Sequence, residues 1–315
     1  MENSEKKEYD LIVIGAGPAG LAAAQYSARA NLNTLVLDQG LGGGQAANIF
    51  NLENYPGVFP PVQGWQWIST MKNQAESFGA VIKQASVSSV DKVDGRFIVK
   101  THGAEYTSLT LIFATGAEHR TLGVTGEKEF SGRGVSYCAT CDGPFFKNKD
   151  VVVVGGGDSA CDEASYLSTL CSHVTVVHRK SQFRAQKAVA QRVLSNPKIT
   201  VRFNSLVTQI LGDKKVSSVE LTDTVTGEKS SLETSAVFIF VGMTPQVSLF
   251  SNLKTDDAGY VVTDEDMATS IPGLFAAGDV RSKSFRQIVT ACSDGAIASH
   301  SAQNYIRLLK NEEYK

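Results

Sequence analysis

The sequence predicts an α/β fold of two similar domains with parallel sheets, the second inserted into the first. Three observations lead to this prediction. A short apolar run leads into a glycine-rich turn near the N-terminus, the same pattern returns in the middle of the chain, and each copy is followed later by another apolar run. The length of 315 residues also suits two domains, since domains commonly have about 100–200 residues.

The first domain begins with an apolar run at residues 11–14, as expected for a strand buried in a parallel sheet. A G-x-G-x-x-G turn follows, then an alanine-rich helical segment at 21–30 and a second strand at 34–37 that ends at Asp38. The turn is formed by Gly15, Ala16, Gly17, Pro18, Ala19 and Gly20. This order of strand, turn, helix, strand and acid is the Rossmann pattern for binding a dinucleotide.

Each part of this pattern has a physical reason. Gly15 permits the tight turn, Gly17 lets a pyrophosphate approach the backbone, and Gly20 lets the helix pack closely on the strand. The free N–H groups and the positive dipole end of the helix favour phosphate groups. Asp38 can accept hydrogen bonds from a ribose. We therefore expect the first domain to bind a dinucleotide through this turn and this carboxylate.

The second domain repeats the pattern in the same register. An apolar run at 151–154 leads into a glycine turn, and a strand at 174–177 follows a helical segment. The turn is formed by Gly155, Gly156, Gly157, Asp158, Ser159 and Ala160. The pattern allows alanine at its third glycine position. We expect Gly155, Gly157 and the two polar residues after them to contact a second dinucleotide.

The residue after the second strand distinguishes the two domains. Where the first domain has Asp38, the second has His178, followed by Arg179 and Lys180. An acid suits a free ribose 2′-hydroxyl, whereas cations suit a 2′-phosphate. The first domain should therefore hold an adenine dinucleotide without that phosphate. The second should hold NADPH, with Arg184 as a further phosphate contact. The alternative is that these cations form an ordinary solvated surface.

The remaining segments complete the two domains. Short alternating strands are expected at 81–100. Buried runs at 109–114 and 236–241 are expected to be equivalent late strands of the two domains. A further strand closes on a Gly-Asp turn within 273–279, and the segment 287–309 has the length and apolar spacing of an amphipathic helix.

The chain is expected to cross between the domains near residues 117 and 246. The first domain then comprises residues 1–117 and 247–315, and the second comprises residues 118–246. This arrangement places the second nucleotide-binding pattern inside the first domain's sequence.

The close cysteine pair, Cys138 and Cys141, lies in a glycine-rich stretch of the inserted segment. Two cysteines separated by two residues can form half of a zinc site or a reversible disulfide. Zinc normally needs two further ligands, and the sequence has no second close cysteine pair. We therefore predict a redox disulfide and no metal site, with two inert small residues as the remaining alternative.

Asp142 directly follows the pair. Thiol–disulfide exchange requires one sulfur to leave as a thiolate and another to be protonated, and a neighbouring carboxyl group can carry that proton. We predict this catalytic role for Asp142, the alternative being a simple turn residue. The other three cysteines, Cys161, Cys171 and Cys292, are expected to be small core residues.

Composition narrows the partners and the compartment. Thirty Lys and Arg against 32 Asp and Glu give a formal net charge of -2, so neither nucleic acid nor an anionic membrane is expected as a partner. The sequence has no apolar run of the roughly 18 residues that a membrane span needs. The charged first ten residues are unlike a signal peptide, and five thinly spread cysteines are unlike a secreted disulfide framework. We therefore expect a cytoplasmic protein.

In order and spacing, these motifs resemble those of the low-molecular-weight thioredoxin reductases along essentially the whole chain. The matching segments are residues 15–20, 43–45, 54–57, 114–116, 138–142, 178–180, 183–185, 278–279 and 286–287. The resemblance implies FAD in the first domain, NADPH in the second, a homodimer, and thioredoxin or a similar small disulfide protein as substrate.

The resemblance also implies further site residues. The implied FAD contacts are Asp38, Gly43, Gln45, Asn54, Ala114, Thr115, Gly116, Gly278, Asp279, Arg286 and Gln287. In the family, the first cysteine of the pair exchanges with the substrate and the second lies nearer the flavin. The second domain rotates in the family to alternate between these partners, so the crossings near 117 and 246 would be hinges.

Three positions depart from the usual family pattern. Lys180 stands where arginine is common, which makes the preference for NADPH less sharp, because lysine lacks the bidentate fork. Pro144 stands where an aromatic residue is frequent, and Cys292 where alanine is common.

Two rival functions remain open. One is a reductase of another thiol carrier, although such enzymes usually carry an added N-terminal domain and only ten residues precede the first strand here. The other is a flavin-binding protein without turnover, against which the intact cysteine pair and both glycine turns argue.

Overall fold

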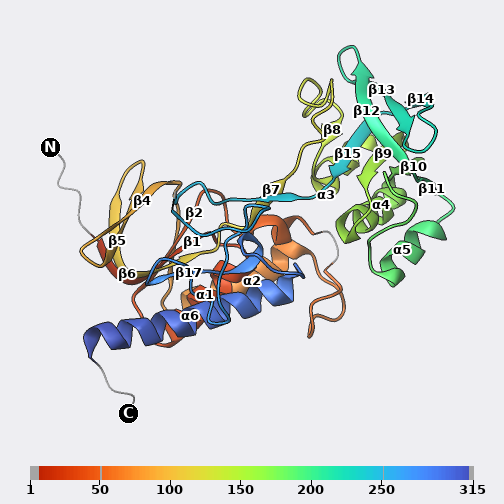
Figure 1. Ribbon diagram of the computed structural model, residues 1–315. Coiled ribbons are helices and arrows are strands. Elements are labelled where there is room, and N and C mark those ends of the chain that lie inside the picture. Colours follow the sequence, from red (N-terminus) through yellow and green to blue (C-terminus); the bar gives the residue numbers. More distant parts are fainter. Residues whose placement is uncertain (1–6, 50–51, 251, 312–315) are drawn as a thin grey trace. The chain divides into compact units, whose positions relative to one another are not determined.

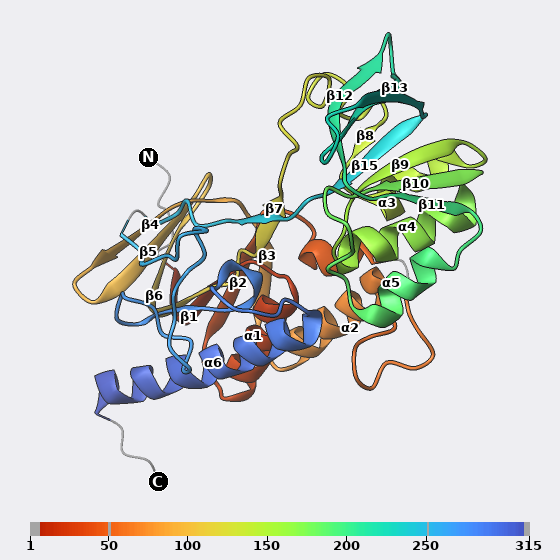
Figure 2. The ribbon, with the colours of Figure 1, turned by 45° about the vertical axis from the view of Figure 1, so that its right-hand side comes forward.

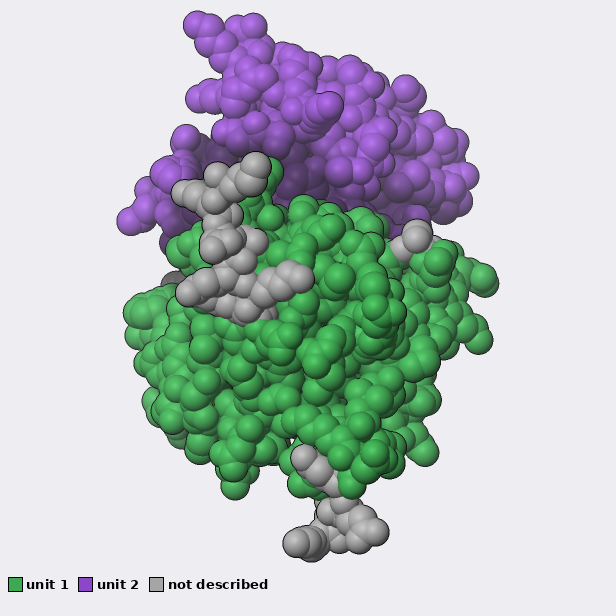
Figure 3. Space-filling view, turned by 90° about the vertical axis from the view of Figure 1, so that its left-hand side faces the viewer, with its two compact units in different colours: residues 1–118, 244–315 green, residues 119–243 purple. Residues whose placement is uncertain are grey.

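The computed structural model describes residues 7–49, 52–250 and 252–311. The chain divides into two compact units (Figures 1 and 3). Unit 1 is Met1–Glu118 with Thr244–Lys315, and unit 2 is His119–Met243. The chain crosses between them within β7 (Ala117–His119) and β16 (Met243–Pro245), which form a two-stranded sheet. The predicted fold class, one α/β domain inserted into another, is confirmed.

Unit 1 is built on a seven-stranded sheet in the order β3-β2-β1-β6-β5-β4, with β17 also paired to β6. The first glycine turn leaves the sheet at the carboxyl end of β1, where β6 also ends, because Ile14 is in register with Phe113. The parallel strands are β1 (Lys7–Ile14), β2 (Thr34–Asp38), β3 (Val81–Gln84), β6 (Glu105–Phe113) and β17 (Leu274–Ala276). The antiparallel strands are β4 (Val87–Val93) and β5 (Arg96–Thr101).

Alternating side chains of this sheet pack into two cores. Leu11 and Val13 face a cluster with residues of the three main helices, while Ile12 and Ile14 face a cluster with β4, β5 and the segment after β16. The helices are α1 (Pro18–Arg29), α2 (Gly64–Ser77) and α6 (Ile288–Lys310), with the short turns η1 (Gly44–Asn48) and η3 (Gly278–Val280). The α6 helix runs alongside α1 (Figures 1 and 2), so closely that a Cβ on Gly295 would lie 2.1 Å from the Ala19 oxygen.

Unit 2 repeats this plan with a five-stranded parallel sheet in the order β11-β10-β9-β15-β8. Helices pack against one face of the sheet and a three-stranded antiparallel sheet packs against the other. The parallel strands are β8 (Val135–Ser136), β9 (Asp150–Gly155), β10 (His173–Val177), β11 (Ile199–Arg202) and β15 (Ala236–Phe240). The antiparallel strands are β12 (Ser205–Gly212), β13 (Val216–Asp223) and β14 (Lys229–Glu233). The helical segments are α3 (Ala139–Asp142), η2 (Gly143–Phe146), α4 (Asp158–Leu170) and α5 (Lys187–Leu194).

Two further properties bear on the choice of site. Of the helices that the structure describes, none combines the length and the apolar character needed to cross a membrane. In the same described segments, no group of three or more His, Cys, Asp or Glu side chains is arranged to hold a metal ion.

Candidate active site

The first glycine turn joins β1 to α1 and leaves its backbone open to a ligand. A Cβ on Gly15, whose φ is +104°, would lie 2.2 Å from the Ala114 oxygen, and one on Gly20 would lie 1.8 Å from the Gly15 oxygen. A Cβ on Gly17, in contrast, would have nothing within 4 Å. Gly17 begins α1 without a side-chain cap, so the first N–H groups of the helix are available to phosphate oxygens.

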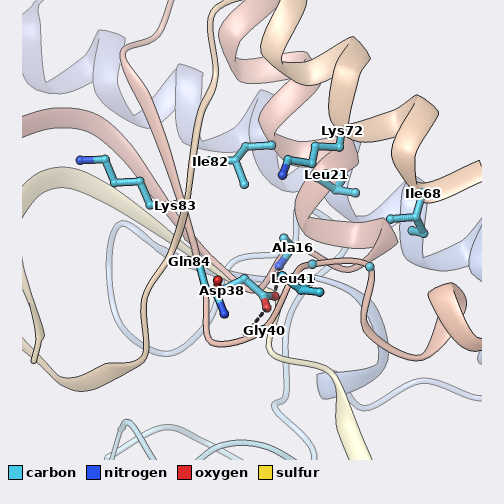
Figure 4. A pocket seen from close by; sticks show the side chains of 12 residues that line it. Ala16, Leu21, Asp38, Gly40, Leu41, Ile68, Lys72, Ile82, Lys83 and Gln84 are labelled. Atoms are coloured by element: carbon cyan, nitrogen blue, oxygen red, sulfur yellow. Dashed lines mark hydrogen bonds between the residues drawn. The ribbon is translucent and has the colours of Figure 1, made fainter. Parts of the chain in front are cut away.

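The carboxylate of Asp38 is fixed beside this turn. Its Oδ2 accepts the Ala16 N–H at 2.7 Å, and its Oδ1 accepts the Gly40 N–H at 2.8 Å (Figure 4). Each carboxylate oxygen can accept a further hydrogen bond, so Asp38 can still receive ribose hydroxyls. It lines a cavity of about 90 Å³ together with Lys72 of α2 and Lys83 of β3, two cations that sequence reasoning missed.

Several other predicted residues of unit 1 are held by the protein itself. Gln45 donates from Nε2 to the Ala117 oxygen at 2.6 Å, and the Thr115 hydroxyl donates to the Gln246 oxygen at 2.7 Å. Gly43 begins η1 with a φ of +94°, and a Cβ there would lie 2.8 Å from Cγ2 of Ile68. These contacts give the small residue and the two polar residues structural roles within unit 1.

A second group of predicted residues meets at the start of α6. Asn54 donates from Nδ2 to Oε1 of Gln287 at 3.1 Å, although the two residues are far apart in sequence. Gly278, with a φ of +81°, packs against the first glycine turn, because a Cβ there would lie 2.8 Å from the Cβ of Ala19. The structure therefore brings the Gly278–Asp279 turn to the beginning of α1.

This group contains two buried polar atoms that have no hydrogen-bond partner in the part of the chain that the structure describes. They are Oδ1 of Asp279 and Nε of Arg286. The guanidinium of Arg286 also lies over the Tyr260 ring, 3.8 Å from its centroid. Buried polar atoms ordinarily have hydrogen-bond partners. Oδ1 of Asp279 lies 3.5 Å from the Lys283 Nζ but accepts no hydrogen bond, and Nε of Arg286 donates none, so this acceptor and this donor fit a polar cofactor bound beside the open glycine turn.

The second glycine turn has the same construction. A Cβ on Gly155 would lie 2.5 Å from the Phe240 oxygen, whereas a Cβ on Gly157 would have only the Arg184 guanidinium near it, at 3.8 Å. Asp158 accepts the backbone N–H of Gln186 at 2.7 Å and its side-chain amide at 3.1 Å. The loop that carries the predicted phosphate contacts is thereby tied to the glycine turn.

His178 is buried, whereas its place in the sequence, next to Arg179 and Lys180, suggested an exposed cation that contacts a phosphate. Its ring is buried beneath the turn, so that a Cβ on Gly156 would lie 2.3 Å from it, and it packs against Phe183 and Phe203. Burial lowers the pKa of His178, and the nearby arginines and lysine lower it further. The ring thus supports the turn from below, and its contact with a cofactor stays a prediction. Arg179, Lys180 and Arg184 are exposed.

Cys138 and Cys141 form a disulfide, with 5.4 Å between their Cα atoms. Cys138 begins α3, and its Sγ accepts the Cys141 N–H at 3.2 Å. Its own N–H donates to the Ser136 hydroxyl at 3.1 Å. Cys138 is half-buried, Cys141 is exposed, and Asp142 lies at the end of α3 with its N–H donating to the Cys138 oxygen at 3.2 Å. A backbone N–H aimed at Sγ favours a thiolate at Cys138 after reduction.

Comparisons with known proteins agree with two glycine turns and a redox disulfide. The family model described as pyridine nucleotide-disulphide oxidoreductase matches residues 9–295. The chain belongs to this family.

Among curated relatives of this oxidoreductase, the thioredoxin reductase of Treponema pallidum is 54% identical over 304 residues, covering 96% of this chain and 99% of that protein. The thioredoxin reductase of Bacillus subtilis is 48% identical over 311 residues, covering 98% of each chain. The crystal structure of Lactococcus lactis thioredoxin reductase matches with a TM-score of 0.92 at 42% identity, covering 95% of this chain and 99% of the other. The predicted resemblance to low-molecular-weight thioredoxin reductases is confirmed.

The oxidoreductase also has a buried carboxylate before its redox pair that sequence reasoning missed. Glu127 is 4% exposed and accepts three hydrogen bonds, from the N–H groups of Leu122 and Gly123 at 2.7 Å each and from the Tyr137 hydroxyl at 2.8 Å. Tyr137 immediately precedes Cys138. Burial, and then the bond to Glu127, raises the pKa of Tyr137. This tyrosine is therefore a neutral donor that ties the cysteine segment to the preceding loop.

The three remaining cysteines of the oxidoreductase are free. Cys161 and Cys171 are buried among apolar side chains of unit 2, and burial raises their pKa to about 12 and about 11. Cys292 is half-buried in α6 with Sγ 3.8 Å from the Pro18 oxygen, and burial raises its pKa too. The raised pKa disfavours the reactive thiolate at all three, which leaves the exchange chemistry to the disulfide pair.

Proposed function

We propose that this chain is a thioredoxin-disulfide reductase that uses NADPH and FAD, with FAD bound by unit 1 and NADPH by unit 2. The observation that carries the proposal is the Cys138–Cys141 disulfide, formed within a chain that has an open glycine turn in each unit. The relatives that bear the name thioredoxin reductase support thioredoxin as the substrate.

The residues present in unit 1 fit FAD. The first glycine turn offers helix N–H groups to a pyrophosphate, and Asp38 offers free acceptor capacity to a ribose. The buried Oδ1 of Asp279 and Nε of Arg286, which make no hydrogen bond within the described chain, offer an acceptor and a donor to the rest of the cofactor. When bound, FAD and NADPH supply the two-electron chemistry that reduces a disulfide.

The residues of unit 2 fit NADPH better than NADH. Arg179, Lys180 and Arg184 are exposed around the end of β10 and the second glycine turn, with no acid at the position equivalent to Asp38. Three cations suit a 2′-phosphate, which carries negative charge, and Arg184 lies close to Gly157 as well.

The cysteines carry the exchange reaction. Two electrons and two protons convert the Cys138–Cys141 disulfide to two thiols. The Cys138 thiolate then attacks one sulfur of the substrate disulfide, forming a mixed disulfide and releasing the other substrate sulfur as a thiolate. Cys141 attacks Sγ of Cys138, which restores the Cys138–Cys141 bond and releases the second substrate sulfur. The two substrate thiolates take up the two protons of the dithiol after they are released, and we assign Asp142 to carry one of these protons.

The roles of the two cysteines follow from their surroundings. The Cys141 N–H at 3.2 Å from Sγ of Cys138 stabilises negative charge on that sulfur. This supports Cys138 as the attacking sulfur and Cys141 as the sulfur that resolves the mixed disulfide. We further propose that the enzyme is a homodimer, as its resemblance to the family implies, and that it is cytoplasmic, as its cysteine usage and charged N-terminus led us to expect.

The test is direct. Purified protein should be yellow, release FAD on denaturation, and lose its flavin absorbance when NADPH is added without oxygen. It should then reduce thioredoxin catalytically. FMN in place of FAD would reject the cofactor assignment. Bleaching without thioredoxin reduction would indicate another thiol carrier, and a flavin that NADPH does not bleach would indicate a protein without turnover.

A further inference from the structure

Unit 1 contains a buried ion-pair cluster that joins α6 to the Gly278–Asp279 turn. Asp294 of α6 is 7% exposed. Its Oδ1 lies 2.7 Å from Nη1 of Arg281, and its Oδ2 lies 3.0 Å from Nζ of Lys283. The same Oδ2 accepts the Gly278 N–H at 3.0 Å. One carboxylate thus receives two cations and one backbone donor.

Lys283 connects this carboxylate to a second one. Its Nζ lies 3.5 Å from Oδ1 of Asp279, the atom that has no hydrogen-bond partner in the described chain, and 3.4 Å from the Thr290 hydroxyl. The Lys283 side chain is 11% exposed, so it is held inside the cluster. Two carboxylates and two cations make the cluster neutral, and the shorter contact of Lys283 is with Asp294.

The backbone of the turn depends on the same carboxylate. Gly278 is buried in the left-handed region with a φ of +81°, and it packs on Ala19 at the start of α1. An unpaired buried N–H destabilises a folded chain, and the Gly278 N–H is paired by Asp294. The side chain of Asp294, sixteen residues after Gly278, therefore fixes the conformation of the Gly278–Asp279 turn.

We propose that Asp294 is a positioning residue for flavin binding: it fixes the Gly278–Asp279 turn and retains Lys283, so that the Asp279 carboxylate stays available to the cofactor. This inference rests on the proposed binding of FAD by unit 1. Without Asp294, Lys283 has Asp279 as its nearest carboxylate. The ammonium group, which already lies 3.5 Å from Oδ1 of Asp279, would then lose its shorter contact with Asp294, pair more closely with Asp279 and compete with the polar groups of the flavin.

A role in folding alone makes a different prediction. Removing one member of a buried ion-pair cluster destabilises a protein in any case, because it leaves an uncompensated charge. If Asp294 only stabilised the fold, loss of Lys283 in addition would not improve flavin binding. If Asp294 restrains Lys283, removing that cation from an Asp294 variant should restore part of the affinity.

The experiment uses full-length protein freed of flavin and titrated with FAD, with dissociation constants read from flavin fluorescence and melting temperatures measured in parallel. Asp294→Ala should weaken FAD binding by about tenfold or more, the effect of one charge-assisted hydrogen bond. Asp294→Asn, which can still accept the Gly278 N–H, should lose about threefold. Adding Lys283→Met to Asp294→Ala should recover about threefold or more.

The matched control is Asp10→Ala. Asp10 also pairs with a cation of α6, Lys310 at 3.2 Å, and also accepts a backbone N–H, that of Asn33 at 2.9 Å. It should lower the melting temperature and leave FAD affinity within about twofold.

The outcomes separate this inference from the proposed function. Wild-type protein that does not bind FAD overturns both. Wild-type binding with unchanged affinity in Asp294→Ala and Asp294→Asn overturns the positioning role alone. So does a double variant that recovers none of the affinity lost in Asp294→Ala. Should Asp294→Ala not fold, Asp294→Asn alone and with Lys283→Met decide the question by the same criteria.

Discussion

Glu127 gives the sharpest prediction about the segment that carries the redox pair. Its Oε1 accepts from the Leu122 N–H and the Tyr137 hydroxyl, and its Oε2 accepts from the Gly123 N–H. In Glu127→Gln the amide oxygen can keep the first two partners, but the amide nitrogen, itself a donor, then faces Gly123. One buried donor is left unpaired, at a cost of about 1–3 kcal/mol.

Glu127→Ala removes all three acceptor contacts and should destabilise unit 2 by about 3–5 kcal/mol. Tyr137→Phe removes only the hydroxyl contact and should cost about 1 kcal/mol. The measurement is urea unfolding of the three variants, combined with the rate at which iodoacetamide alkylates the reduced pair. Glu127→Ala should alter that rate, because Tyr137 directly precedes Cys138.

Glu220→Gln is the control, since Glu220 lies in β13 of the same unit and bonds to Thr208 and Lys229 on the surface. It should change neither unfolding nor alkylation appreciably. If Glu127→Ala unfolds like the wild-type protein, or if it loses no more stability than Tyr137→Phe, the carboxylate does not organise this segment and the reasoning is refuted.

Three further predictions follow from single side chains. Arg179→Ala should lower kcat/KM for NADPH by about 10–150-fold, the effect of one charge-assisted hydrogen bond, and leave kcat/KM for NADH unaffected. Equal losses with both cofactors would show that Arg179 does not contact the 2′-phosphate. The control Arg192→Ala on α5 should leave kcat/KM for both cofactors unchanged. Burial raises the pKa of Glu163 from 4.5 to about 7. Between these two pH values the folded chain keeps a proton that the unfolded chain loses, so the free energy of unfolding falls as the pH rises from 4.5 to about 7. Glu163→Gln should therefore match wild type at pH 5 and exceed it by about 1–3 kcal/mol at pH 8; a gain at pH 5 instead would contradict this origin. In native reduced protein, iodoacetamide at pH 8 should leave Cys161 and Cys171 unlabelled by mass spectrometry, and their rapid labelling would show that they are not buried.

The features that sequence reasoning found are those determined by local constraints. A glycine turn is set by the backbone within a few residues, so Gly15 and Gly20 could be assigned their roles from order alone, and the structure shows the close approaches that require them. The Cys138–Cys141 pair could be predicted as a disulfide for the same reason. The C-terminal helix expected at 287–309 is observed as Ile288–Lys310, because its apolar spacing is continuous.

The features that were missed depend on contacts between distant segments. Asp294 meets Gly278 and Arg281 only because α6 packs along α1, and nothing in the sequence pairs an acid inside a helix with a turn sixteen residues earlier. The burial of His178 likewise depends on Phe203, which lies in the turn directly after β11. Helix α2 and the antiparallel strands of unit 2 also lacked clear local signals in the sequence. Lys72 lies on α2, so its place in the cavity lining could not be predicted either.

The central claim is that electrons leave this enzyme through Cys138, with Cys141 as the resolving sulfur. The most direct measurement is trapping: reduced Cys138→Ser, Cys141→Ser and control Cys292→Ser proteins are mixed with a thioredoxin that lacks its own resolving cysteine and carries an activated disulfide. The account predicts that the Cys141→Ser variant forms a stable mixed disulfide on Cys138 and that the Cys138→Ser variant forms no mixed disulfide. The Cys292→Ser variant should form only a transient mixed disulfide, which Cys141 resolves. An adduct that forms in Cys138→Ser and not in Cys141→Ser would reverse the two roles and contradict the account.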